Sequence, residues 1–158
     1  MLEHTFDPLQ VLRSYQEFLA ENGKILVSLP NVANWLNRLQ FLLGIFNYEM
    51  TGVMDRTHVR FFTFHSAKKL LEASAFTIHK VDSTPFITRA ILPIIKKIVS
   101  KKSDNVKSII ESPYYRFYVK YVYPIEYCFC RLLPGLFAFR IILVASSQRG
   151  EKTNDYSC

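Results

Sequence analysis

Residues 7–31, DPLQVLRSYQEFLAENGKILVSLPN, carry a clear helix-then-strand pattern. The opening dipeptide is typical of a helix start, because an aspartate caps free N–H groups and a proline fits the first helical position. Apolar residues then recur at helical spacing, which predicts a helix over 7–22, and Gly23 follows as a left-handed helix stop. The next run, KILVSL at 24–29, is short, apolar and partly β-branched, which predicts a buried strand of parallel type.

Further elements follow along the chain. Apolar spacing predicts helices over 32–47 and roughly 66–74, alternation predicts a half-exposed strand at 76–81, and FAFRIILVAS at 137–146 predicts a final strand. Between the helices, residues 48–63 form a polar, irregular stretch. Loops of this length in a compact domain are usually functional or disordered. Ligands of open α/β sheets bind beyond the carboxyl ends of the strands, so we expect the site there.

The composition is that of a folded protein. The chain has 158 residues, of which 49% are hydrophobic and 21% charged, and this excludes wholesale disorder and suits a single domain with a real core. The net charge of +7 attracts phosphates, nucleic acids and anionic membrane surfaces. The three cysteines, Cys128, Cys130 and Cys158, cannot form a disulfide framework, and the N-terminus lacks a signal-peptide pattern. We therefore expect a reducing, cytoplasmic location.

Most of the positive charge lies in a basic aromatic segment over 89–131, where tyrosines and phenylalanines are interleaved with lysines and arginines. Such a segment can cover the sheet and the substrate cleft, or it can lie at a membrane interface. Charges and prolines interrupt it, so it does not predict a transmembrane span. Its aromatic residues match no RNA-binding signature. We therefore favour sheet cover over membrane contact and expect no nucleic-acid partner.

Short motifs follow one another along the first 83 residues or so: LEH at 2–4, GKILVSLPN at 23–31, DRTHVRFFT at 55–63 and LLEASAF at 70–76. In this order they resemble the class I S-adenosylmethionine-dependent methyltransferases. The third motif is similar to the DRTHLRFFT signature of a branch that acts on small molecules and glycans. In the last motif Ala75 stands where the family has glycine, which costs about 1 kcal/mol if the backbone there is left-handed.

The resemblance implies an α/β fold, a partial Rossmann-like methyltransferase sheet with helices on both faces. It implies that the strand at 24–29 lies parallel to a neighbour that is missing from this chain, and that the strand at 137–146 inserts antiparallel. The family's glycine-rich cofactor loop has no counterpart in this sequence. We therefore expect residues 1–147 to be the C-terminal part of a methyltransferase domain, with 84–136 as a basic aromatic helical cover and 148–158 as a polar disordered tail.

The activity implied by the resemblance is methyl transfer from S-adenosylmethionine to a small molecule or glycan-type acceptor. The transfer is an in-line displacement that depends on positioning, and a hydroxyl acceptor also needs a base. His58 is the candidate base because imidazole titrates near neutral pH, and Asp55 is the candidate to orient its ring. Alternatively, His58 only holds the loop in place. By resemblance Glu3 and His4 border the cofactor, although side chains so near a chain end can also be merely solvated.

Three further residues are candidates for binding the acceptor. Asn31 offers both a donor and an acceptor, or else it forms an Asx turn after the preceding proline. Arg56 and Arg60 suit an anionic acceptor, or else they are ordinary surface arginines. No local cluster of histidine, cysteine and carboxylate residues has metal-ligand spacing, so the sequence predicts no metal site.

A second function is also compatible with the sequence: a non-catalytic module, derived from a methyltransferase, that binds a membrane surface or a partner protein. A sheet that begins partway across the fold leaves one edge strand without its neighbour. This edge would then receive a missing N-terminal half or an oligomer partner. The location expected is the cytoplasm, either free or at the membrane periphery.

Overall fold

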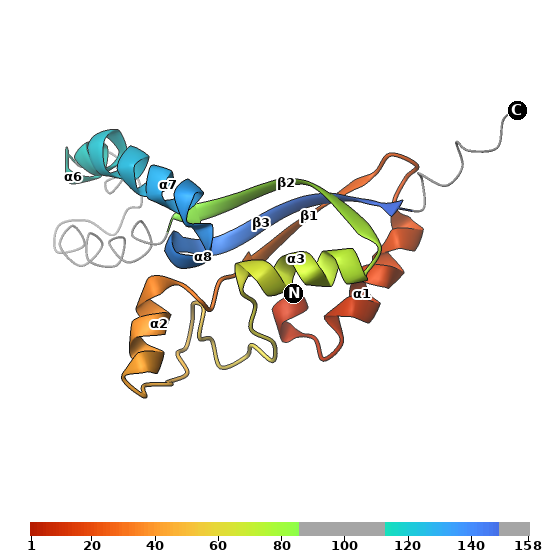
Figure 1. Ribbon diagram of the computed structural model, residues 1–158, viewed down its shortest axis with the longest axis horizontal. Helices are drawn as coiled ribbons and strands as arrows, with labels where there is room; N and C mark the ends of the chain where they lie inside the picture. Colours follow the sequence, from red (N-terminus) through yellow and green to blue (C-terminus); the bar gives the residue numbers. More distant parts are fainter. Residues whose placement is uncertain (86–112, 149–158) are drawn as a thin grey trace, which may run out of the picture.

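The computed structural model describes residues 1–85 and 113–148 as a mixed α/β structure built on a three-stranded sheet (Figure 1). The strands are β1 (Lys24–Pro30), β2 (Phe76–Pro85) and β3 (Ala138–Ser147), and their order in the sheet is β1-β3-β2. The last strand pairs antiparallel with both others, as expected. In the described residues β1 pairs on one side only, with β3, and its other side is the one on which the sequence predicts a missing parallel neighbour.

Helices α1 (Pro8–Tyr15) and α3 (Phe64–Ala73) pack on the same face of the sheet (Figure 1). The core between them and the sheet contains residues from both helices and alternate residues of β3, among them Leu12, Ala67, Leu71, Ile141, Leu143 and Ala145. On the opposite face Leu26 is 69% exposed. The described residues therefore do not confirm the helices on both faces of the sheet that the sequence predicted.

Helix α1 begins as predicted and ends early. The Asp7 carboxylate accepts a hydrogen bond from the Gln10 backbone N–H at 2.9 Å. The helix tightens after Tyr15 into a 3₁₀ turn, η2 (Gln16–Phe18), instead of running to residue 22. Gly23 does not adopt the predicted left-handed backbone. It is required for a different reason, since a Cβ at Gly23 would lie 2.9 Å from the Ala20 carbonyl oxygen.

The predicted helix over 32–47 is shorter in the structure, where α2 spans Trp35–Leu42. The Asn34 side chain caps it by accepting a hydrogen bond from the Asn37 N–H at 3.0 Å. The helix stops at Gly44, whose φ of 73° is left-handed, as a glycine stop requires. The chain from there to α3 is the expected loop, held by short bridges between Asn31 and Phe62 and within the loop.

Helix α3 begins with a complete capping box. The Thr63 side chain accepts from the Ser66 N–H, and the Ser66 side chain accepts from the Thr63 N–H. After the helix, Ala75 adopts a φ of 57°, which is the left-handed backbone that the family glycine implied. The strand that follows is longer than predicted, because β2 continues to Pro85.

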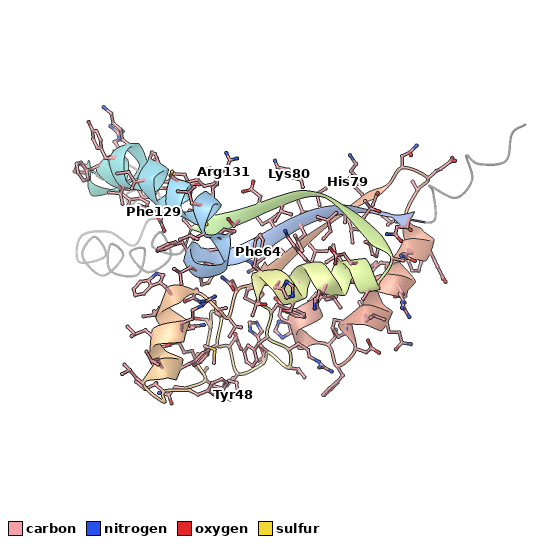
Figure 2. The ribbon with its side chains drawn as sticks, viewed as in Figure 1. Tyr48, Phe64, His79, Lys80, Phe129 and Arg131 are labelled. Carbon is pink, nitrogen blue, oxygen red and sulfur yellow. The ribbon has the colours of Figure 1, made fainter. Side chains whose placement is uncertain are left out.

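The C-terminal helices are α6 (Pro113–Phe117), the π-helical turn η3 (Tyr118–Val122), α7 (Tyr123–Leu132) and α8 (Pro134–Phe137). Helix α7, whose Phe129 and Arg131 are labelled in Figure 2, packs against β2, with the Cys130 Sγ atom 3.0 Å from the Ser83 Oγ atom. Much of the predicted basic aromatic cover, 86–112, and the tail from 149 lie outside the described residues. Among the helices of the described part of the chain, none combines the length and apolar character that crossing a membrane requires.

Candidate functional site

Two of the motifs meet in space although more than fifty residues separate them. The short helix η1 (Leu2–His4) carries the LEH motif, and the Glu3 carbonyl oxygen accepts hydrogen bonds from the N–H groups of Val59 and Arg60 at 2.8 and 3.0 Å. The loop is tied to the same region by the Arg60 guanidinium, which donates to the Phe6 carbonyl oxygen at 2.7 Å. The segments around residues 3 and 58 therefore form one substructure.

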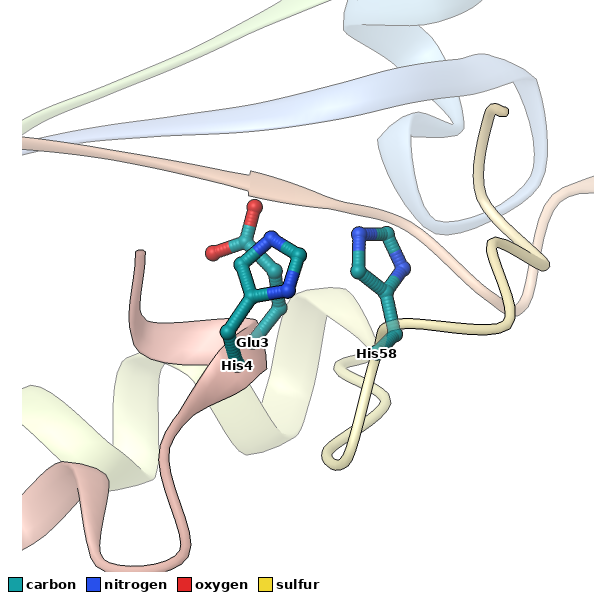
Figure 3. Close-up of side chains that lie close together, drawn as sticks. All are labelled: Glu3, His4 and His58. Carbon is teal, nitrogen blue, oxygen red and sulfur yellow. The ribbon is translucent and has the colours of Figure 1, made fainter. Parts of the chain in front are cut away.

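The side chains of Glu3, His4 and His58 gather at this junction (Figure 3). One carboxylate oxygen and one nitrogen from each ring all lie within 4.8 Å of one another. The two imidazole rings meet edge to face, with centroids 4.9 Å apart and an angle of 66° between their planes. Glu3 is buried, His58 is half-buried and His4 is exposed, so the cluster opens to solvent on one side.

Backbone carbonyl groups orient both rings. The Nδ1 atom of His4 lies 3.0 Å from the Thr57 carbonyl oxygen, and the Nδ1 atom of His58 lies 3.0 Å from the Val53 carbonyl oxygen. A carbonyl oxygen can only accept, so each Nδ1 carries the hydrogen and each Nε2 keeps its lone pair when the ring is neutral. Figure 3 shows one nitrogen of each ring directed towards the side on which the Glu3 carboxylate lies.

Asp55 has a different task from the one predicted. Its carboxylate accepts hydrogen bonds from the backbone N–H and the hydroxyl of Thr57, at 2.8 and 2.7 Å, and these bonds lower the pKa of Asp55. The hydrogen bond that orients the His58 ring goes to the Val53 carbonyl instead. Asp55 thus shapes the turn that presents His58, and the sequence-based assignment of Asp55 as the group that holds the ring is wrong.

The Glu3 carboxylate is the buried charge of the site. Its Oε2 atom lies 2.6 Å from the Met1 ammonium, and its Oε1 atom lies 3.9 Å from the Arg140 guanidinium of β3. Burial raises the pKa of Glu3, but hydrogen bonds from the Met1 ammonium and from its own backbone N–H outweigh that effect, so the pKa lies below its usual value. The group is therefore an anion at neutral pH.

Asn31 is fully buried and serves the fold. Its side-chain NH₂ donates to the carbonyl oxygens of Gly135 and Ala138, at 3.2 and 2.9 Å, and its side-chain oxygen accepts from the Ala33 N–H at 3.1 Å. The last bond is the Asx turn that the sequence offered as the alternative. With both amide hydrogens engaged, the geometry favours this structural role over contact with an acceptor.

The two arginines differ in their surroundings. Arg56 is exposed, and its backbone N–H donates to the Glu49 carbonyl oxygen at 3.1 Å. Arg60 is fixed to Phe6, and together with Lys69 of α3 it lines an open hollow of about 530 Å³. Asp7 lines the same hollow, so the two cations leave one positive charge in excess, which suits an anionic ligand. Arg60 is therefore the better placed of the two for the binding role that the sequence predicted.

A groove of about 410 Å³ lies along β1, and sequence reasoning did not find it. It is lined by residues of η1, by Leu12 and Tyr15 of α1 and by Ile25–Leu29 of β1, and it includes Glu3. Its volume falls in the range of small-molecule pockets. The only signal in the sequence was that the strand at 24–29 lay at an edge of the expected partial sheet.

The cluster of Glu3, His4 and His58 could not be predicted from local metal-ligand spacing, because His58 lies more than fifty residues from the other two. Comparisons with known proteins add no assignment to this geometry. No family model matches the sequence, and no curated protein matches it significantly.

Proposed function

We propose that this chain is the C-terminal part of a class I S-adenosylmethionine-dependent methyltransferase domain, which transfers a methyl group to a small molecule or glycan-type acceptor. The observation that carries the proposal is the contact between the LEH segment and the DRTHVR segment through the Glu3 carbonyl oxygen and the Thr57 carbonyl oxygen. The sequence resemblance rests on both motifs, and their contact supports the proposal that they contribute to one site.

The sheet supports the same proposal. The last strand lies between two earlier strands and runs antiparallel to both, which is the insertion that the resemblance implied. Beyond β1 the groove borders Glu3, so a cofactor-binding half carrying a glycine-rich loop would dock there. On this proposal the chain needs that half for full activity, and the half would also cover the open edge of β1.

Within the proposed enzyme each site residue has a task that follows from its position. The Nε2 lone pair of His58 would accept the proton of a hydroxyl acceptor, and the Val53 carbonyl would stabilise the resulting imidazolium through Nδ1–H. Glu3 and His4 would border the cofactor. Arg60 and Lys69 would bind an anionic part of the acceptor in their shared hollow.

Calorimetric titration with S-adenosylmethionine tests the proposal. Saturable micromolar binding that weakens in Glu3→Gln, and not in the exposed control His65→Gln, would support it. No binding at millimolar ligand, either to this chain or to the chain with any in-frame upstream sequence restored, would contradict it. In an active assembly, His58→Ala should reduce turnover far more than cofactor affinity, whereas equal losses would assign His58 a structural role.

The second candidate function, a membrane-surface module, is favoured by the apolar surface of α6, η3 and α7. Several large apolar side chains there are at least half exposed: Phe117, Ile125, Phe129 and Leu132. The cations Arg116, Lys120 and Arg131 are exposed on the same segment. A basic helix with exposed aromatic residues suits an anionic membrane interface.

Flotation with anionic liposomes at low salt tests this second function. Binding that is lost in Ile125→Asp, and kept in the control Val59→Asp on the distant loop, would support it. Failure of the wild-type chain to float with phosphatidylserine vesicles would exclude it.

A further inference from the structure

We propose that Glu3, His4 and His58 bind a divalent transition-metal ion. The three side chains offer one carboxylate oxygen and two imidazole nitrogens within 4.8 Å of one another. They come from two segments that backbone hydrogen bonds already hold together, so the donors are brought close before any ion binds.

The hydrogen bonds of the rings carry the inference beyond mere proximity. In metal sites the ligating histidine usually donates its other ring N–H to a carboxylate or backbone carbonyl, which fixes the tautomer and the orientation of the ring. Both rings have this arrangement here, with His4 Nδ1 on the Thr57 carbonyl and His58 Nδ1 on the Val53 carbonyl. Each neutral ring is thereby left with its Nε2 lone pair available.

The donor set selects the kind of ion. Two imidazole nitrogens and one carboxylate suit Zn²⁺, Co²⁺, Ni²⁺ or Fe²⁺, whereas Mg²⁺ and Ca²⁺ prefer sites made of oxygen atoms. Bonds of about 2.0–2.2 Å to a tetrahedral ion place neighbouring ligand atoms about 3.4 Å apart, so ligand atoms up to 4.8 Å apart must approach one another by up to about 1.4 Å. The exposed His4 side chain can supply this movement, since it lies on the open side of the cluster.

A metal ion would have to compete for the Glu3 carboxylate. The carboxylate is buried and already interacts with the Met1 ammonium at 2.6 Å and with the Arg140 guanidinium at 3.9 Å. Binding of the ion would therefore displace the Met1 ammonium from Glu3. Three protein ligands leave further coordination positions open, as in metal sites that bind a water molecule or a substrate.

The inference does not depend on methyl transfer. A bound ion would occupy the Nε2 lone pair of His58, so His58 would act as the general base proposed above only in molecules that hold no ion. The binding measurement below involves no cofactor and no acceptor, and its failure would leave the methyltransferase proposal standing.

The test is titration of the untagged full chain with Co²⁺, followed by its visible absorption, and with Zn²⁺ in competition. We expect one ion per chain, displaced by Zn²⁺ and not by Mg²⁺. His4→Gln, His58→Gln and Glu3→Gln should each weaken binding at least about tenfold, while His65→Gln, an exposed histidine of α3, should bind as the wild type. Binding that survives unchanged in His58→Gln, or no binding at submillimolar Co²⁺ or Zn²⁺, would overturn the proposal.

A second measurement on the wild-type chain does not depend on whether the variants fold. In histidine ring nitrogen NMR, Zn²⁺ should shift the Nε2 signals of His4 and His58 and leave those of His65 and His79 in place. Shifts confined to His65 or His79 would likewise contradict the assignment.

Discussion

The Glu3 carbonyl oxygen accepts a hydrogen bond from the Val59 N–H at 2.8 Å, and this bond joins the N-terminal turn to a loop more than fifty residues away. The same oxygen also accepts from the Arg60 N–H at 3.0 Å. The side chain of Glu3 and the side chain of His58 are brought together because their backbones are joined here. Main-chain hydrogen bonds therefore hold the site together, and a measurement on the bonded amides reports whether these bonds persist.

Amide hydrogen exchange should reveal this junction. We expect the amides of Val59 and Arg60 to exchange markedly more slowly than that of Thr51, which lies in the exposed turn of the same loop. The measurement is exchange of the native chain followed by NMR or by peptide mass spectrometry. Equal and fast exchange at all three positions would mean that the loop is not joined to η1.

Ala75→Gly should stabilise the fold. Ala75 has a φ of 57°, a backbone that glycine adopts without the steric cost that alanine bears, so we expect a gain of about 1 kcal/mol in the free energy of unfolding. Urea denaturation measures it. The control Ala73→Gly, in the last turn of α3, should instead destabilise by up to about 1 kcal/mol. A loss of stability in Ala75→Gly would argue against the left-handed conformation.

Leu71→Ala should test the core. Leu71 is fully buried between α3 and the sheet, and removing its side chain should cost about 2–5 kcal/mol through lost burial and the cavity left behind. Leu42, at the end of α2, is 83% exposed, so the matched Leu42→Ala should change stability by only about 0.5 kcal/mol or less. Similar effects of the two substitutions in urea denaturation would contradict the packing.

The two cysteines of α7 should differ in reactivity. Burial raises the pKa of the Cys130 thiol, and the nearby carboxylates of Glu126 and Asp82 add to the rise against the effect of a hydrogen bond with Ser83. Cys128 is exposed. Because the thiolate is the reactive form, alkylation of the buried Cys130 should be slow at neutral pH and should accelerate as the pH rises, and the exposed Cys128 should react faster.

Peptide mapping by mass spectrometry after timed alkylation at several pH values measures both rates. In denaturant the difference should disappear, since burial is its main cause. Equal rates in the native chain would place Cys130 at the surface.

The parts of the fold that sequence predicted well are those encoded locally. The Asp7 cap and the strand at 24–29 depend on neighbours within a few residues, and both are present in the structure. The end of α1 and the use of Gly23 were predicted wrongly, because the chain tightens after Tyr15 and Gly23 lies against the Ala20 carbonyl.

The candidate site could be predicted only in part, because its residues come from segments far apart in the sequence. His58 and Glu3 could be singled out one by one, from residue type and motif. Their meeting depends on hydrogen bonds across more than fifty residues, and the Val53 carbonyl that orients His58 has no signature in the sequence because every residue has a carbonyl. Asn31 is the opposite case. The sequence marked it as a candidate for binding the acceptor, but its side-chain NH₂ donates both hydrogens to backbone carbonyl groups.

The order of strands in the sheet has a consequence for how the chain is made. The central strand β3, Ala138–Ser147, comes late in the sequence, and the two outer strands pair with it and not with each other. On the ribosome, β1 and β2 are therefore synthesised long before their common partner, because about fifty residues separate β2 from β3 and about a hundred separate β1 from β3. The sheet should therefore form only after residue 147 has left the ribosome. Nascent chains stalled before that point should expose unpaired strands and bind chaperones.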